Sequence, residues 1–150
     1  EKEYPPMNTE QQRQAARHQI LQRLHEYCWG YDSNDMPLLG SVFTEDASSG
    51  GFVAGAEVAW GPWSGKASIV EALSAIRNSQ PDRRRHVVDS YLFDELDEQR
   101  AEVRLYVSIF SYANGQPPHL VTTGEYSFTA VNSGDRWRLS RLDEVLDSAF

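Results

Sequence analysis

Apolar residues recur at two different spacings along this chain, with helical periodicity in the first half and strand periodicity in the second. Near the start they recur every three or four residues, as in an amphipathic helix with one side on a core. The residues of this stripe are Ile20, Leu24, Tyr27, Cys28 and Tyr31. Thr9 followed by Gln12 is typical of a capping box, so we expect a helix over 9–32.

Two shorter helices are expected after the first. Asp35 suits the N-cap of a helix over 36–43. A third helix is expected over 66–78, because its apolar residues share one face. The segment 44–64 between these two helices is rich in glycine and other turn residues. We expect a single short strand there, near 57–60.

The period changes to two in the second half of the chain, which is typical of half-buried strands. The expected strands cover 84–92, 100–113, 119–131 and 136–145. Helices followed by an antiparallel meander, with no room for helical crossovers, predict an α+β fold whose strongly curved sheet wraps over the helices. We expect one domain over 9–150 and a flexible leader at 1–8.

Composition and charge narrow the class of protein. Hydrophobic residues make up 40% of the 150 positions and charged residues 24%, as in an ordinary globular domain. The formal net charge of −8 disfavours nucleic acid as a partner, because phosphate binding requires a basic face. The three arginines at 83–85 form the one basic cluster. We interpret them as alternating between solvent and the rim of a pocket, where one arginine meets an anionic substrate.

Location and assembly are expected from simpler features. No apolar run approaches the roughly 20 residues of a membrane span, so no membrane association is expected. Cys28 is the only cysteine, which indicates a reducing, cytoplasmic location and an inert buried thiol. Strand positions at 103–110 are apolar on both faces. This favours a homodimer or homotrimer formed through the outer face of the sheet.

Four polar residues carry the candidate chemistry. Tyr27, Tyr31 and Asp32 lie within about one turn at the end of the first helix, and His86 lies in an expected strand. A carboxylate that orients a histidine, with phenols nearby, is a set of groups suited to moving protons at a small organic substrate. Either tyrosine can be the one that reaches a pocket, and the spacing does not decide between them.

Aromatic side chains are the candidates for substrate binding. They are Phe52, Trp60, Trp63 and Phe110. The first three suit the mouth of an apolar pocket for a planar ligand. The alternative for Trp63 is core packing under the turn at 61–65.

No cofactor is expected. His18, His25, His86 and His119 have no metal-ligand spacing with one another or with acidic residues. A phosphate-cradling glycine loop is also absent from the sequence. We therefore expect no catalytic metal, nucleotide or flavin.

Three short segments, in this order, carry a family resemblance. They are Phe-Thr-Glu-Asp-Ala at 43–47, Gly-Pro-Trp-Ser-Gly at 61–65 and Arg-His-Val-Val at 85–88. Over about 9–145 the chain resembles the SnoaL-like branch of the nuclear transport factor 2-like superfamily. The resemblance implies a conical α+β barrel around a deep pocket. The superfamily includes polyketide cyclases, scytalone dehydratase, bile-acid dehydratase, ketosteroid isomerase and the non-catalytic β subunits of aromatic-ring dioxygenases.

The resemblance also implies roles for the candidate residues. The segment Tyr-Asp-Ser-Asn-Asp at 31–35 is similar to a segment of scytalone dehydratase, and His86 to that family's first catalytic histidine. The bile-acid dehydratases have a tyrosine five residues before the aspartate, as Tyr27 precedes Asp32. By this resemblance Asp32 and His86 form the acid–base pair, and Tyr27 or Tyr31 polarises an oxygen.

Two departures limit what the resemblance implies. The second histidine of scytalone dehydratase corresponds to the stretch 107–110, which is Val-Ser-Ile-Phe here. The position of the ketosteroid isomerase base falls in 48–51, which contains no carboxylate. We therefore expect a cofactor-independent dehydratase, or a related isomerase or cyclase, acting on a small apolar or polyketide-like molecule. The alternative is a non-catalytic binding or assembly module.

Overall fold

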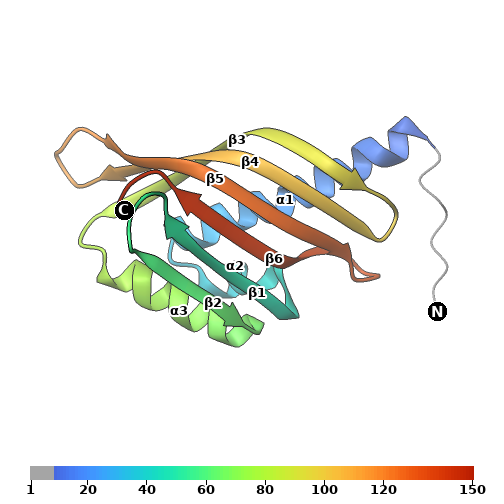
Figure 1. Cartoon of the computed structure of the whole chain (residues 1–150), viewed down its shortest axis with the longest axis horizontal. Helices are drawn as coiled ribbons and strands as arrows, with labels where there is room; N and C mark the ends of the chain where they lie inside the picture. Colours follow the sequence, from blue (N-terminus) through green and yellow to red (C-terminus); the bar gives the residue numbers. More distant parts are fainter. Residues whose placement is uncertain (1–8) are drawn as a thin grey trace.

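The computed structural model describes residues 9–150, and the leader expected at 1–8 lies outside the described residues. The elements follow in the order α1 (Glu10–Asp32), α2 (Met36–Ser41), β1 (Phe43–Val53), β2 (Ala59–Ser64), α3 (Lys66–Ser79), β3 (Arg83–Leu96), β4 (Arg100–Tyr112), β5 (His119–Asn132) and β6 (Trp137–Leu146). Figure 1 shows the three helices gathered on one face of a twisted sheet. The predicted α+β class is confirmed.

The six strands form one mixed sheet in the order β2-β1-β6-β5-β4-β3. Neighbouring strands are antiparallel except β1 and β6, which are parallel. Because β2 and β3 are the two edges, the described sheet is wrapped but is not closed into a barrel. The pairing of the first and last strands brings the end of the chain back beside β1.

The helix α1 begins and ends as the sequence predicts. The Thr9 side chain accepts a hydrogen bond from the Gln12 backbone N–H, and the Gln12 side chain accepts one from the Thr9 backbone, which completes a capping box. The predicted stripe is buried along the helix. Asp35 then caps α2 by accepting a hydrogen bond from the backbone N–H of Leu38. The short connection between the helices fixes Asp32 at the end of α1.

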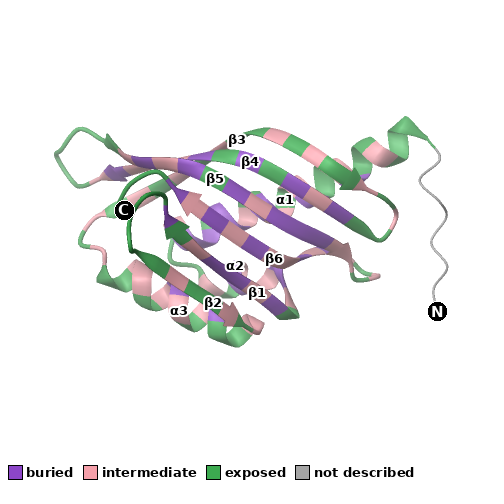
Figure 2. Ribbon diagram, in the orientation of Figure 1, coloured by how far each residue is buried: buried purple, intermediate pink, exposed green. Residues whose placement is uncertain are grey.

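The core lies between the helices and the concave face of the sheet. Buried and less buried positions alternate along β4, β5 and β6, as the stripes in Figure 2 show. Fully buried side chains include Ile20 and Leu24 from α1, Ile69 from α3, and Phe128 from β5. Apolar contact between these layers is the main force that holds the fold together.

The prediction for 44–64 was wrong in part, because the short strand expected near 57–60 overlaps β2 but the long strand β1 was missed. The structure has two paired strands there, β1 and β2, and α2 ends at Ser41 before the expected end at 43. Serine and glycine are poor strand formers, but β1 is paired with β2 on one side and with β6 on the other. A Cβ atom at Gly51 would lie 2.5 Å from the carbonyl oxygen of Glu144 and 2.5 Å from the Trp60 ring. Gly51 therefore permits a close strand contact that the sequence pattern disguised as a turn.

Candidate active site

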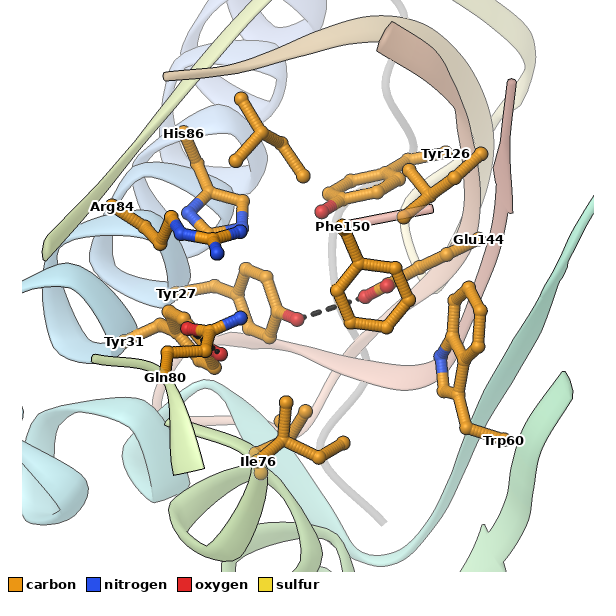
Figure 3. A pocket seen from close by; sticks show the side chains of 13 residues that line it. Tyr27, Tyr31, Trp60, Ile76, Gln80, Arg84, His86, Tyr126, Glu144 and Phe150 are labelled. Carbon is orange, nitrogen blue, oxygen red and sulfur yellow. Dashed lines mark hydrogen bonds between the residues drawn. The ribbon is translucent and has the colours of Figure 1, made fainter. Parts of the chain in front are cut away.

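A small cavity lies under the concave face of the sheet, where the helices and the last strand meet (Figure 3). Its polar lining consists of Tyr27, Tyr31, Gln80, Arg84, His86, Tyr126 and Glu144. Its apolar lining consists of Trp60, Leu73, Ile76, Ile109, Leu146 and Phe150. The cavity volume is about 30 Å³, which is room for roughly one or two water molecules. Both tyrosines of the candidate set reach the cavity.

Asp32 holds His86 by two hydrogen bonds. Its Oδ1 lies 2.6 Å from the imidazole Nδ1, and its Oδ2 accepts the backbone N–H of His86 at 2.8 Å. An ionised carboxylate only accepts hydrogen bonds, so Nδ1 carries a proton, and in the neutral imidazole Nε2 then has the lone pair. The His86 side chain is only 8% exposed. The contact expected between these two residues is present.

The fold explains how two residues so far apart in sequence meet. Asp32 is the last residue of α1, where the helix dipole disfavours a negative charge, and the two bonds from His86 offset that cost. Along β3, Arg84, His86 and Val88 are more buried than their neighbours Arg83, Arg85 and Val87. The alternation of a strand therefore turns His86 and Arg84 towards the cavity.

Tyr27 forms a buried pair with Glu144 on β6. The Tyr27 hydroxyl donates to Glu144 Oε1 at 2.8 Å, and the two residues are 2% and 8% exposed. Burial raises the pKa of the Glu144 carboxyl, although the Tyr27 hydrogen bond opposes this shift. Burial, with the nearby Glu144 charge, also raises the pKa of Tyr27 far above its ordinary value. The pair thus places a carboxyl with raised proton affinity in the cavity wall.

Tyr31 lies in the cavity wall between His86 and Gln80 and contacts both. Its ring packs edge-on against the imidazole with the ring centroids 5.0 Å apart. Its hydroxyl donates to Gln80 Oε1 at 2.8 Å. Burial raises the pKa of Tyr31. The phenol is therefore a neutral wall that fixes the orientation of the imidazole.

Arg84 is fixed by a carboxylate but is not fully satisfied. Its Nε lies 3.0 Å from Asp82 Oδ1, and Ser111 Oγ also donates to Asp82. The Arg84 side chain is 10% exposed. Its Nη1 is buried and has no hydrogen-bond partner among the described residues.

The four expected aromatic binding residues separate into two groups. Trp60 lines the cavity, where its ring packs against that of Phe150 with the centroids 4.9 Å apart. Phe52 is 50% exposed, and Trp63 packs on the core, as its alternative interpretation had it. Phe110 alternates along β4 with the cavity residue Ile109 and so lies on the other face. The structure does not bring Phe52, Trp63 or Phe110 into the cavity lining.

Glu144 and Gln80 are cavity residues that sequence reasoning missed. The signal for Glu144 was present, because it lies between Leu142 and Leu146 at the period of a strand and so shares their buried face. A carboxyl at such a position needs an explanation. Gln80 follows the end of α3 and carries no comparable signal.

A wider groove lies outside β3, beside the end of α1. It has a volume of about 670 Å³ and is lined by residues that include Trp29, Asp32, Arg85 and His86. The Asp32–His86 pair therefore separates this groove from the inner cavity. The Arg85 side chain lies on this outer side, where its guanidinium stacks over the Tyr112 ring, 4.5 Å from the ring centre.

Three further observations concern the part of the chain that the structure describes. Cys28 is buried, and burial raises the pKa of its thiol. No group of three or more His, Cys, Asp or Glu side chains is arranged to hold a metal within residues 9–150. None of the helices in that range is both long and apolar enough to span a membrane.

The sequence matches a known family over most of its length. The model of the SnoaL-like domain matches residues 12–143, so the chain belongs to the SnoaL-like family. No curated protein matches this chain. The resemblance on which the sequence prediction rested is confirmed.

Solved structures share the fold. The beta subunit of a proposed aromatic-ring-hydroxylating dioxygenase from Novosphingobium aromaticivorans has a TM-score of 0.76 and 16% identity, covering 91% of this chain and 92% of its own. A proposed scytalone dehydratase from the same organism has a TM-score of 0.72 and 18% identity, covering 91% and 90%. An NTF2-like protein with a cystatin-like fold, also from that organism, has a TM-score of 0.70 and 18% identity, covering 96% and 94%. At these identities the likeness establishes the fold alone.

Proposed function

We propose that this protein is a cofactor-independent acid–base enzyme that removes water from a small carbonyl compound, or carries out a related isomerisation or cyclisation. The observation that supports this most is the double hydrogen bond from His86 to Asp32, with the imidazole in the cavity wall. A histidine held in this tautomer presents Nε2 as a base. The solved scytalone dehydratase-like structure supports this class of reaction by its fold.

The elimination balances with the groups present. His86 Nε2 takes a proton from the carbon beside the carbonyl, and the electron pair of that C–H bond forms an enolate. The enolate then re-forms the carbonyl, a C=C bond forms, and the β-hydroxyl leaves. Either His86 returns its proton to the departing oxygen, or Glu144 supplies one, after which His86 releases its proton to solvent and Glu144 takes one up. The raised pKa of Glu144 favours its protonated form as a donor.

The experiment uses a panel of β-hydroxy ketones, whose dehydration gives conjugated enones that absorb in the ultraviolet. Wild-type protein is compared with His86→Ala and with a matched control, His18→Ala, which removes an exposed histidine from α1. We expect turnover to fall at least ~100-fold in His86→Ala, the usual effect of a positioned acid–base group. His18→Ala should retain full activity. Equal activity of all three proteins would contradict the proposal.

One observation favours the second candidate, a binding or assembly module. The cavity is small because Trp60 and Phe150 cover it, and a substrate larger than a few atoms enters only if these rings move. The solved beta subunit with this fold is consistent with a module. Binding of apolar ligands without any turnover, unaffected by His86→Ala, would support this alternative.

Assembly and location stay predictions. Leu92 and Tyr106 on the outer side of the sheet are 49% and 58% exposed, which is consistent with copies that associate through that face. Sedimentation of wild-type protein beside Tyr106→Glu tests this, because a charge there should dissociate such an oligomer. The cytoplasmic location proposed from the single cysteine is tested by cell fractionation.

A further inference from the structure

Neither of the two candidate tyrosines on α1, Tyr27 and Tyr31, has a hydroxyl proton free for a ligand. The Tyr27 hydroxyl donates to Glu144 and the Tyr31 hydroxyl donates to Gln80, each at 2.8 Å. A phenol has one proton to donate. The role expected for these phenols, a hydrogen bond to the substrate oxygen, therefore requires a contact in the site to break first.

Arg84 brings to the cavity a cationic donor that has no acceptor of its own within residues 9–150. Its Nη1 is buried and has no acceptor among the described residues. A buried charged donor without an acceptor is costly, so the position is suited to a partner that arrives with a ligand. Figure 3 shows the guanidinium directed into the cavity, in the same region as His86 and Gln80.

The guanidinium is held in place through its Nε atom. Arg84 Nε is held by Asp82 at 3.0 Å, and Ser111 supports the same carboxylate. A donor fixed before the ligand binds needs no reorganisation when charge develops on the ligand. Asp82 thus acts as a positioning residue for Arg84.

We propose that Arg84 supplies the hydrogen bond to the substrate's carbonyl oxygen, which becomes negatively charged as the enolate forms. This inference rests on the proposed function and names the residue that stabilises its enolate oxygen. The assignment replaces Tyr27 and Tyr31 in that role. It leaves Tyr31 as a wall and Tyr27 as the partner of Glu144.

The spacing along β3 fits this division of labour. Arg84 and His86 are two residues apart on one strand, so their Cα atoms are separated by about 7 Å and their side chains share one face. One residue can then meet the carbonyl oxygen while the next inward residue meets the neighbouring C–H bond. A guanidinium stabilises an oxyanion better than a neutral donor does, because the hydrogen bond is charge-assisted.

The test is a binding measurement that does not depend on turnover. 4-Nitrophenolate serves as a stable mimic of an enolate, and nitrobenzene as its neutral analogue. Their affinities are measured by absorbance and calorimetry in the wild type and in Phe150→Ala, which uncovers the cavity. In either of these proteins, adding Arg84→Met should lower the affinity for nitrophenolate at least ~10-fold and leave the affinity for nitrobenzene unchanged. Arg84→Lys, which keeps the charge, should be intermediate.

The matched control is Arg85→Met. It removes the same charge one residue further along β3, from the side chain that stacks on Tyr112 outside the cavity, and it should leave both affinities unchanged. The inference is overturned if Arg84→Met binds both probes as the wild type does. It is also overturned if neither the wild type nor Phe150→Ala prefers nitrophenolate to nitrobenzene.

The two experiments distinguish failure of the Arg84 assignment from failure of the proposed acid–base function. If His86→Ala abolishes turnover while nitrophenolate binding is independent of Arg84, the enzyme stands and the assignment of Arg84 is wrong. If binding depends on Arg84 while His86→Ala has full activity, the anion site stands and the acid–base function is wrong. Circular dichroism spectra of each variant establish that the fold is retained.

Discussion

The carboxylate of Asp32 accepts two hydrogen bonds from His86, one from the ring Nδ1 at 2.6 Å and one from the backbone N–H at 2.8 Å. One bond fixes the tautomer of the ring, and the other fixes the strand that carries it. Asp32 therefore ties the end of α1 to β3 as well as orienting the imidazole. Its effect on chemistry is exerted through His86.

This relationship predicts that the Asp32 and His86 mutations are not additive. Asp32→Asn should lower turnover about 100-fold, because the amide can hold the wrong tautomer. Adding Asp32→Asn to His86→Ala should cost little more than His86→Ala alone. Steady-state kinetics of the two single variants and the double variant check this. Two losses that multiply in the double variant would show that the residues act independently.

The two tyrosines should differ in their contribution to stability. Tyr27→Phe removes the hydrogen bond to the buried Glu144, and an unsatisfied buried group costs about 1–3 kcal/mol. Tyr31→Phe removes a bond to the half-buried Gln80 and should cost about 0.5–1.5 kcal/mol. Urea unfolding of both variants measures the difference. An equal or larger loss for Tyr31→Phe would contradict the greater importance of the Tyr27–Glu144 pair.

Glu144 should make stability depend on pH. Its pKa is raised in the folded protein by burial, so the folded state binds the proton more tightly than the unfolded state does. The stability from this group is complete below the ordinary glutamate pKa and is lost as the pH rises through the folded pKa. Glu144→Gln removes this dependence.

The measurement is urea unfolding of the wild type and Glu144→Gln from about pH 4 to about pH 9, a range that spans the ordinary glutamate pKa and the region above it. The free energy of unfolding of the wild type should fall relative to that of the variant as the pH rises. A constant difference between the two proteins would show that Glu144 has an unshifted pKa.

Phe150 should control access to the cavity. Its ring packs on Trp60 over the cavity, so Phe150→Ala should speed the association of an apolar ligand such as nitrobenzene. Stopped-flow measurement of binding checks this, and Phe52→Ala is a control because that exposed ring is absent from the lining. Equal association rates for the wild type and both variants would show that Phe150 does not cover the entrance.

The sequence predicted the parts of this protein that local rules determine. The cap at Thr9, the stripe along α1 and the alternation along β4 to β6 are local patterns, and each is present in the structure. The strand β1 was missed because Gly50 and Gly51 usually mark a turn. Glycine is required at these positions because β1 makes close contact with β2 and β6, and only the tertiary structure reveals that contact.

The candidate site divides in the same way. The contact between Asp32 and His86 could be expected because the family resemblance supplied the pairing of distant segments. The cavity position of Glu144 follows from strand alternation. The residue was overlooked because a carboxyl side chain in a strand is usually assigned to the exposed face. The unsatisfied Nη1 of Arg84 depends on Asp82 and on the packing around it, and no local pattern encodes that.

Removal of a proton from carbon by His86 can be followed by hydrogen–deuterium exchange, which needs no complete turnover. The panel of β-hydroxy ketones is incubated in deuterated buffer, and NMR follows exchange of the proton beside the carbonyl. We expect exchange by wild-type protein, exchange at least ~100-fold slower in Asp32→Asn, and only background exchange in His86→Ala. Exchange by His86→Ala at the wild-type rate, or no exchange of any ketone by the wild type, would contradict it.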